Sequence, residues 1–104
     1  MAYAQALQAL GDPTRRAVLE ELRSGPRAVG EIAERLPVSR PAVSQHLRVL
    51  KEAGLVTERQ SGTRRLYRVE PDALAELREY LESFWEEALA NFKAAAETEE
   101  RRTK

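Results

Sequence analysis

The chain has no cysteine among its 104 residues and a single histidine, His46. Without cysteine there are no disulfide bonds, thiolate metal sites, cysteine nucleophiles or thiol redox switches. No apolar run approaches the ~18 residues that a membrane-spanning helix needs. The N-terminal sequence MAYAQALQAL lacks the basic start and apolar centre of a signal peptide. These absences predict a cytoplasmic protein with no membrane partner, and the length favours one domain.

Net charge is also absent, because 17 basic and 17 acidic side chains cancel. The balance hides an asymmetry: residues 1–69 carry 12 basic and 7 acidic side chains, whereas residues 70–104 carry 5 and 10. Residues 39–69 alone hold 7 basic and 2 acidic side chains. A basic cluster on one compact element is typical of a nucleic-acid contact, although it is equally compatible with a solvated surface.

Helix and turn signals divide the chain into five helices and one hairpin. Helices are expected at residues 2–10, 13–23, 29–36, 39–53 and 72–96. Two strands, 55–60 and 64–69, flank the loop Ser61-Gly62-Thr63. The expected fold is mainly α with a small β-hairpin, in the order ααααββα: a winged helix-turn-helix with a two-stranded antiparallel wing. Residues 1–96 are expected to form this domain, with dimerisation helices at both ends, and the polar residues 97–104 a frayed tail.

The helix expected at residues 39–53 has one apolar and one polar face. A short turn joins it to the preceding amphipathic helix, which is the geometry of a helix-turn-helix whose second helix enters the DNA major groove. Ser39 is placed to cap this helix, and its apolar face carries Val43, Leu47, Leu50 and Ala53. The opposite face is short of carboxylates and carries Arg40, Pro41, Ser44, Gln45, Arg48 and Lys51. Arginine, glutamine and serine read base edges, and Lys51 is expected to contact phosphate.

The hairpin after that helix adds a second basic element. Thr63, Arg64 and Arg65 lie at or beside its tip, where a wing can reach a neighbouring minor groove or phosphates. Tyr67 and Val69 are expected to face the core. An ordinary surface hairpin is the alternative, which the position directly after a helix-turn-helix disfavours.

The segment from Ser39 to Val56 reads Ser-x-x-x-x-Ser-Gln-His-Leu-x-x-Leu-x-x-Ala-Gly-Leu-Val. Together with the upstream LGDPTRRAVLEEL, it resembles the winged-helix repressors of the arsenical-resistance (ArsR/SmtB) family over about residues 3–92. The resemblance implies a homodimeric bacterial or archaeal transcriptional regulator, typically a repressor of partly palindromic operators. It also implies DNA contacts from the recognition helix and wing contacts: Ser39, Arg40, Ser44, Gln45 and Arg48, with Arg64 and Arg65.

The resemblance does not extend to the ligands of the family's metal sensors. Those sensors use cysteine pairs near the recognition helix, or histidine and carboxylate ligands on the last helix. Transition-metal sites need several soft or imidazole ligands, and this chain has only His46, expected to lie partly buried behind the recognition helix. The carboxylates Asp72, Glu76 and Glu79 are expected to form a solvated face. We predict a member that senses no metal and needs no cofactor.

The last helix has an apolar arc wider than one small domain needs. Leu74, Leu77, Leu81, Phe84 and Ala88 follow a 3-4-3-4 spacing, which Tyr80, Trp85, Leu89 and Phe92 broaden to about half the cylinder. An exposed aromatic patch favours a second subunit, with Tyr3 and Leu7 of the first helix completing the interface. The alternative is that the whole arc is core within one chain.

A two-fold dimer would place two recognition helices about one DNA turn apart, ~34 Å, on an inverted repeat. The expected function is therefore that of a sequence-specific, dimeric DNA-binding repressor that senses no metal. Repression of its own gene is one form that this function could take. The alternative is a winged-helix module for protein–protein interaction. An enzyme is disfavoured, because the chain lacks cysteine, paired histidines and a phosphate-binding glycine-rich loop.

Overall fold

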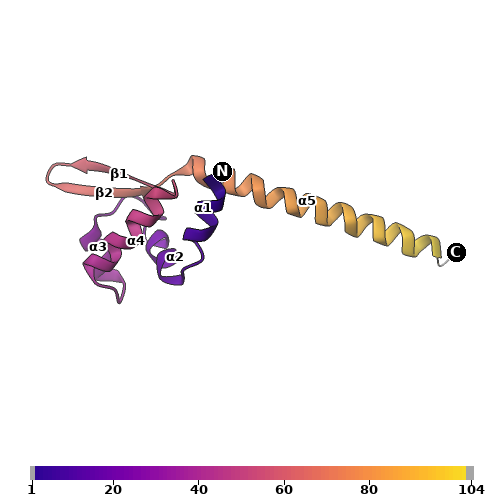
Figure 1. Ribbon diagram of the computed structural model, residues 1–104, viewed down its shortest axis with the longest axis horizontal. Helices are drawn as coiled ribbons and strands as arrows, with labels where there is room; N and C mark the ends of the chain where they lie inside the picture. The colour runs from indigo at the N-terminus through magenta and orange to yellow at the C-terminus, as the bar shows by residue number, and fades with distance from the viewer. Residues whose placement is uncertain (1, 103–104) are drawn as a thin grey trace.

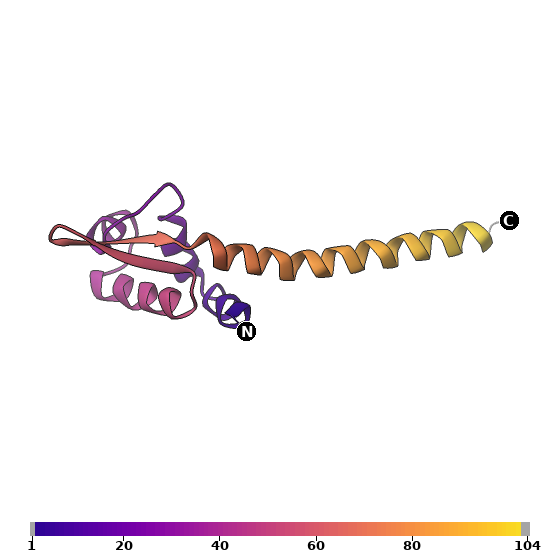
Figure 2. The same ribbon diagram turned by 90° about the horizontal axis from the view of Figure 1, so that it is seen from above.

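A computed structural model describes residues 2–102. It contains five helices and one hairpin in the predicted order (Figure 1). The elements are α1 (Ala2–Ala9), α2 (Pro13–Glu20), α3 (Val29–Arg35), α4 (Arg40–Glu52), β1 (Val56–Ser61), β2 (Arg64–Val69) and α5 (Pro71–Arg102). Helices α1 to α4 and the hairpin form a small body, and α5 projects from it (Figures 1 and 2). The predicted fold class, a winged helix-turn-helix, is confirmed.

Helix α2 begins as its sequence predicts and ends earlier. Asp12 is the N-cap, and its Oδ1 accepts hydrogen bonds from the backbone N–H groups of Thr14 (2.8 Å) and Arg15 (3.0 Å). The predicted end at Arg23 is wrong, because the helix stops at Glu20. The N–H groups of Leu22 and Arg23 bond three residues back rather than four, so the chain continues as tight turns.

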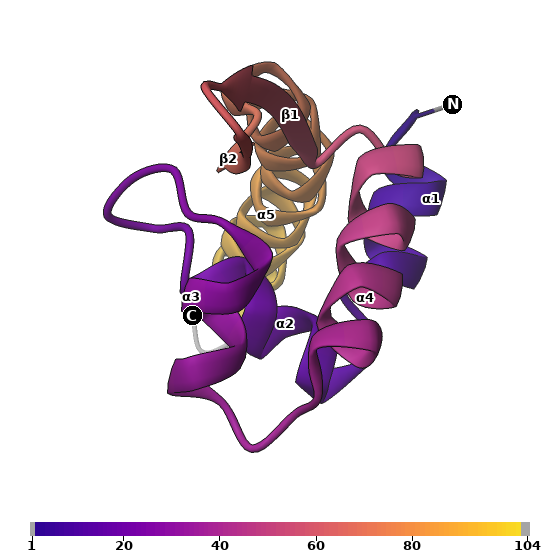
Figure 3. The same ribbon diagram turned by 90° about the vertical axis from the view of Figure 1, so that its left-hand side faces the viewer.

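Helix α4 is capped by Ser39, whose Oγ accepts a hydrogen bond of 3.3 Å from the N–H of Ala42. Its buried face packs on α2 and α3 and supplies the centre of the core. Figure 3 looks at the body from its wing end, with α3 and α4 in front of α2 and the hairpin above them. The fully buried core side chains are Val18, Ile32, Val43, Leu47, Leu50, Leu55 and Val56.

The hairpin differs from expectation at its turn. Strand β1 runs one residue further than predicted, to Ser61, which pairs with Arg64, so the turn consists of Gly62 and Thr63 alone. Gly62 has φ of +64°, the left-handed conformation that such a tight turn needs. Tyr67 and Val69 pack against the core as predicted.

A short pairing ties the hairpin to the body, and the sequence did not reveal it. The N–H of Arg27 donates to the carbonyl of Tyr67 at 3.0 Å, and the N–H of Tyr67 donates to the carbonyl of Arg27 at 2.8 Å. Arg27, in the segment before α3, thus pairs with β2 as a residue of a third strand would. The base of the wing is held by backbone hydrogen bonds on both edges of β2.

Helix α5 extends far beyond the body. The chain measures 72 × 26 × 22 Å with a radius of gyration of 19.5 Å, whereas a compact chain of this length would have about 13 Å. The predicted end at residue 96 is wrong: the helix continues to Arg102. Residues 93–102, KAAAETEERR, contain no glycine or proline and are mostly strong helix formers, and Arg101 and Arg102 suit the negative end of the helix dipole. Of the helices within residues 2–102, none combines the length and apolarity needed to cross a membrane.

Candidate nucleic-acid interface

The polar face of α4 points into solvent along its whole length. All seven candidate contact residues on this element are exposed: Ser39, Arg40, Pro41, Ser44, Gln45, Arg48 and Lys51. The opposite face is buried, with Val43, Leu47 and Leu50 each at 0% exposure. The predicted orientation of the helix is therefore confirmed, and the DNA contacts themselves stay predictions.

Arg40 lies against the preceding helix at a glycine. A Cβ added at Gly30 of α3 would stand 3.1 Å from Nη2 and 3.2 Å from Cζ of Arg40. A Cβ at position 30 would require the Arg40 guanidinium to shift by a few tenths of an ångström. Gly30 thus borders the Arg40 side chain, a contact between two helices that helical periodicity could not reveal.

The exposed wing residues are Thr63, Arg64 and Arg65. Arg64 does not extend freely from the tip, because its Nη2 forms an ion pair with Glu31 of α3. Glu31 also accepts a hydrogen bond of 3.1 Å from the N–H of Ala28. This backbone hydrogen bond first, and then the charge of Arg64, hold the pKa of Glu31 below its usual range. One carboxylate thus caps α3 and anchors the wing to the helix-turn-helix.

A second carboxylate joins the wing to α4. Oε1 of Glu58 on β1 lies 2.5 Å from Nζ of Lys51 and 3.4 Å from Nη1 of Arg65. The hydrogen bond from Lys51, followed by that from Tyr67, holds the pKa of Glu58 below its usual range. Burial, and then the hydrogen bond to Glu58, raises the pKa of Tyr67. Lys51 and Arg65 could be predicted from the sequence as candidate contacts, whereas their shared partner Glu58 is identified by the structure.

The candidate dimer residues fall into two groups. The exposed ones are Leu7 and, on α5, Leu74, Leu81, Phe84, Trp85, Ala88 and Phe92. Leu77, in contrast, is 8% exposed and so is buried within the single chain, and its part in a dimer interface stays a prediction. Helix α1 packs on α5, and Ala73 in the first turn of α5 packs against the chain's own core.

Tyr3 also has a role within the chain. Its ring stacks on Tyr80 with centroids 4.4 Å apart, and Tyr80 meets Phe84 edge-on at 5.0 Å. These aromatic contacts hold α1 against α5. Tyr3 is half-buried. Its ring therefore packs on α5 within the chain and is still partly accessible next to the exposed apolar face of α5.

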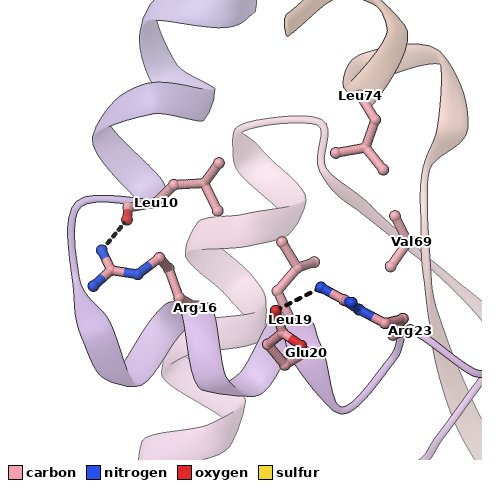
Figure 4. Close-up of a pocket in the computed structure, with 7 residues that line it drawn as sticks. All are labelled: Leu10, Arg16, Leu19, Glu20, Arg23, Val69 and Leu74. Carbon is pink, nitrogen blue, oxygen red and sulfur yellow. Dashed lines mark hydrogen bonds and ion pairs between the residues drawn. The ribbon is translucent and has the colours of Figure 1, made fainter. Parts of the chain in front are cut away.

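A hollow of about 320 Å³ opens between the α1–α2 turn, the end of β2 and the start of α5 (Figure 4). Its apolar lining comes from Leu10, Leu19, Val69 and Leu74, and its rim carries Arg16, Glu20 and Arg23. Arg16 donates to the carbonyl of Leu10 at 2.6 Å, and Arg23 pairs with Glu20 at 2.8 Å. Leu74 borders both this hollow and the exposed face of α5.

His46 is half-buried behind the exposed face of α4, as predicted. Its Nδ1 is buried and has no hydrogen-bond partner within residues 2–102. Across the same residues, no group of three or more histidine, cysteine, aspartate or glutamate side chains is arranged to hold a metal ion. The carboxylates Asp72, Glu76 and Glu79 are all exposed on α5.

Comparison with known proteins identifies relatives along most of the chain. A family model for a helix-turn-helix domain matches residues 10–59. The chain is 56% identical over 95 residues to the HTH-type transcriptional regulator Rv2034 of Mycobacterium tuberculosis, which covers 91% of this chain and 89% of that protein. The structure of an ArsR-like transcriptional regulator from Rhodococcus sp. RHA1 matches with a TM-score of 0.77 and 35% identity, over 91% of this chain and 92% of that one. A homodimeric winged helix-turn-helix DNA-binding domain from Mycobacterium bovis, described as a possible ArsR-family regulator, matches with a TM-score of 0.66 and 33% identity, over 83% of this chain and 80% of that one.

Proposed function

Because the chain belongs to the ArsR/SmtB family of winged helix-turn-helix transcriptional regulators, we propose that it is a dimeric repressor that binds an inverted-repeat operator. Proteins of this family are DNA-binding regulators and not enzymes. The observation that carries the proposal is the exposed face of α4, where guanidinium, amide and hydroxyl groups stand opposite a fully buried apolar face. These are the groups that recognise base edges in the major groove.

The distribution of charge supports this orientation. The wing and the exposed face of α4 lie in the basic part of the chain, and the acidic α5 projects away from the body on the side opposite the hairpin tip (Figure 1). DNA bound to α4 and the wing would therefore be distant from most of the carboxylates. This separation explains how a chain with zero net charge can bind a polyanion.

The exposed apolar face of α5 supports the dimer. Its exposed fractions are 52% at Leu81, 55% at Phe84, 65% at Trp85 and 73% at Phe92. Such a face is unusual on a monomer, and a similar solved domain is described as homodimeric. In the proposed assembly, helices at both ends of one winged helix-turn-helix domain form a two-fold interface. That symmetry presents two copies of α4 to successive turns of DNA.

We further propose that the protein acts in the cytoplasm without a metal sensor. A DNA-binding regulator works where the chromosome lies. The available ligands support the absence of a metal sensor. The chain has no cysteine, and its one imidazole, of His46 on α4, is half-buried. Transition-metal sensing needs several such ligands together.

Selection of duplexes from a random library, followed by sequencing of the retained DNA, tests the proposal. We expect an inverted repeat with half-sites one helical turn apart. Gln45→Ala and Arg48→Ala should each weaken binding by ~1–3 kcal/mol and relax preference at one base pair. Arg23→Ala is the matched control, because Arg23 is exposed and paired with Glu20 on α2. Retained preference in both α4 variants would show that another face reads the DNA, and no binding at low salt would favour the protein-interaction alternative.

A further inference from the structure

Glu58 links two elements that the proposed function places on DNA. Its carboxylate meets Lys51 from the last turn of α4 and Arg65 from the wing. The side chain of Glu58 is 19% exposed, whereas those of Lys51 and Arg65 are 49% and 66% exposed. The carboxylate therefore lies beneath the two cations, and the cations face solvent.

The strand that carries Arg65 is itself anchored. Glu58 pairs across the hairpin with Tyr67, and Tyr67 is bonded through its backbone to Arg27 in the body. Lys51 in turn belongs to α4, whose opposite face is buried in the core. The cluster of Glu58, Lys51 and Arg65 thus connects two rigid supports through one acceptor.

We propose that Glu58 is a specificity-determining positioning residue, which holds Lys51 and Arg65 together so that the recognition helix and the wing engage the same site. The inference rests on the proposed DNA-binding surface. Glu58 contributes in two opposite ways. Its negative charge repels phosphate and so weakens binding to any DNA, while its hydrogen bonds order two cations in advance and so strengthen binding to the one DNA geometry that both can reach.

The charge effect and the ordering effect can be separated by comparing non-specific DNA with the specific operator. Non-specific binding depends on charge and tolerates mobile side chains, so neutralising Glu58 should strengthen it about twofold. Specific binding requires both cations in place, and the entropy of ordering two freed side chains should weaken it about fivefold. The charge effect acts on both kinds of DNA and cancels in their ratio, so the ratio of specific to non-specific affinity should fall about fivefold.

The test compares Glu58→Gln with Glu52→Gln in the full chain. Glu52 is the neighbour of Lys51 on α4, is 66% exposed, and within residues 2–102 forms one long ion pair of 3.8 Å, with Arg48. Its substitution therefore removes the same charge and leaves the Glu58 cluster intact. Affinities are measured for the inverted repeat recovered by selection and for a shuffled duplex of equal composition. We expect Glu52→Gln to strengthen binding to both duplexes alike and Glu58→Gln to lower their ratio. A ratio equally preserved in both variants would overturn the inference, because Glu58 would then act through charge alone.

A double-mutant cycle with Lys51→Ala and Arg65→Ala gives a second readout, whose first part, in the native chain, does not depend on the folding of Glu58→Gln. If both cations share one anchor, their effects on operator affinity are non-additive in the native chain. The coupling should disappear in the Glu58→Gln background. Additive effects in the native chain would refute the shared anchor. Absence of operator binding by the native protein would instead refute the proposed function, so the two failures are distinguishable.

Discussion

Trp85 offers the sharpest test of the proposed dimer, because it is 65% exposed on the apolar face of α5 and belongs to neither the Tyr3–Tyr80 stack nor the Tyr80–Phe84 pair. A tryptophan side chain presents up to ~250 Å², so ~160 Å² per subunit is available for burial. Two copies at ~25 cal/mol per Å² give an upper bound of ~8 kcal/mol. Loss of half of that free energy, ~4 kcal/mol, would raise the dissociation constant of the dimer about a thousandfold.

Trp85→Glu should therefore convert the dimer to monomers at micromolar concentration, as measured by sedimentation velocity. Ala90→Glu is the matched control, since it adds the same charge about 140° around the helix, on the exposed side of α5 away from Trp85. The control should remain dimeric, and both variants should keep the helical signal of the native chain. Monomers of Trp85→Glu should also bind the operator weakly, because each would present a single recognition helix. Dimers of Trp85→Glu as stable as the native protein would show that the interface lies elsewhere.

Two further predictions concern protons and metal ions. Because the folded-state pKa of Glu58 is below its ordinary value of 4.5, its contribution to stability is present above pH 4.5 and is lost as the pH falls through the lowered pKa. The thermal midpoint of the native chain should exceed that of Glu58→Gln near neutral pH and converge with it as the pH falls below 4.5 and through the lowered pKa of Glu58; a gap that stays constant would contradict this assignment. Operator affinity in filter binding should be the same with added zinc and with a chelator, and release of DNA on adding zinc would reveal a metal site.

Local signals in the sequence predicted the order of elements and the orientation of α4. Pro13 and Asp12 mark the start of α2, Ser39 caps α4, and Gly54 lies just beyond its end. These signals act within one or two turns of chain. The periodicity of Val43, Leu47 and Leu50 is sufficient to predict which face of α4 is buried, because a helix places residues three and four apart on one side.

The ends of two helices were predicted less well, because competing tendencies decide them. Nothing in residues 21–24 forbids a helix, yet the backbone tightens into turns after Glu20. At the other end, the polar residues 97–104 suggested a frayed tail, although the intrinsic helix propensity of residues 97–102 is high. There the strong helix formers prevailed, and Thr98 adds a hydrogen bond of 2.9 Å from its Oγ1 to the carbonyl of Ala94.

The sequence by itself determined the fold class, the exposed face of α4 and the basic wing, since each depends on residues close together along the chain. Tertiary structure decided which partners those residues have: Glu31 for Arg64, Glu58 for both Lys51 and Arg65, and Gly30 for Arg40. It also buried Leu77 within the single chain, while the neighbouring apolar residues Leu74 and Leu81 of α5 stay exposed. Contacts between segments depend on how helices and strands cross in space, and that geometry follows from the packing of the whole core rather than from local periodicity.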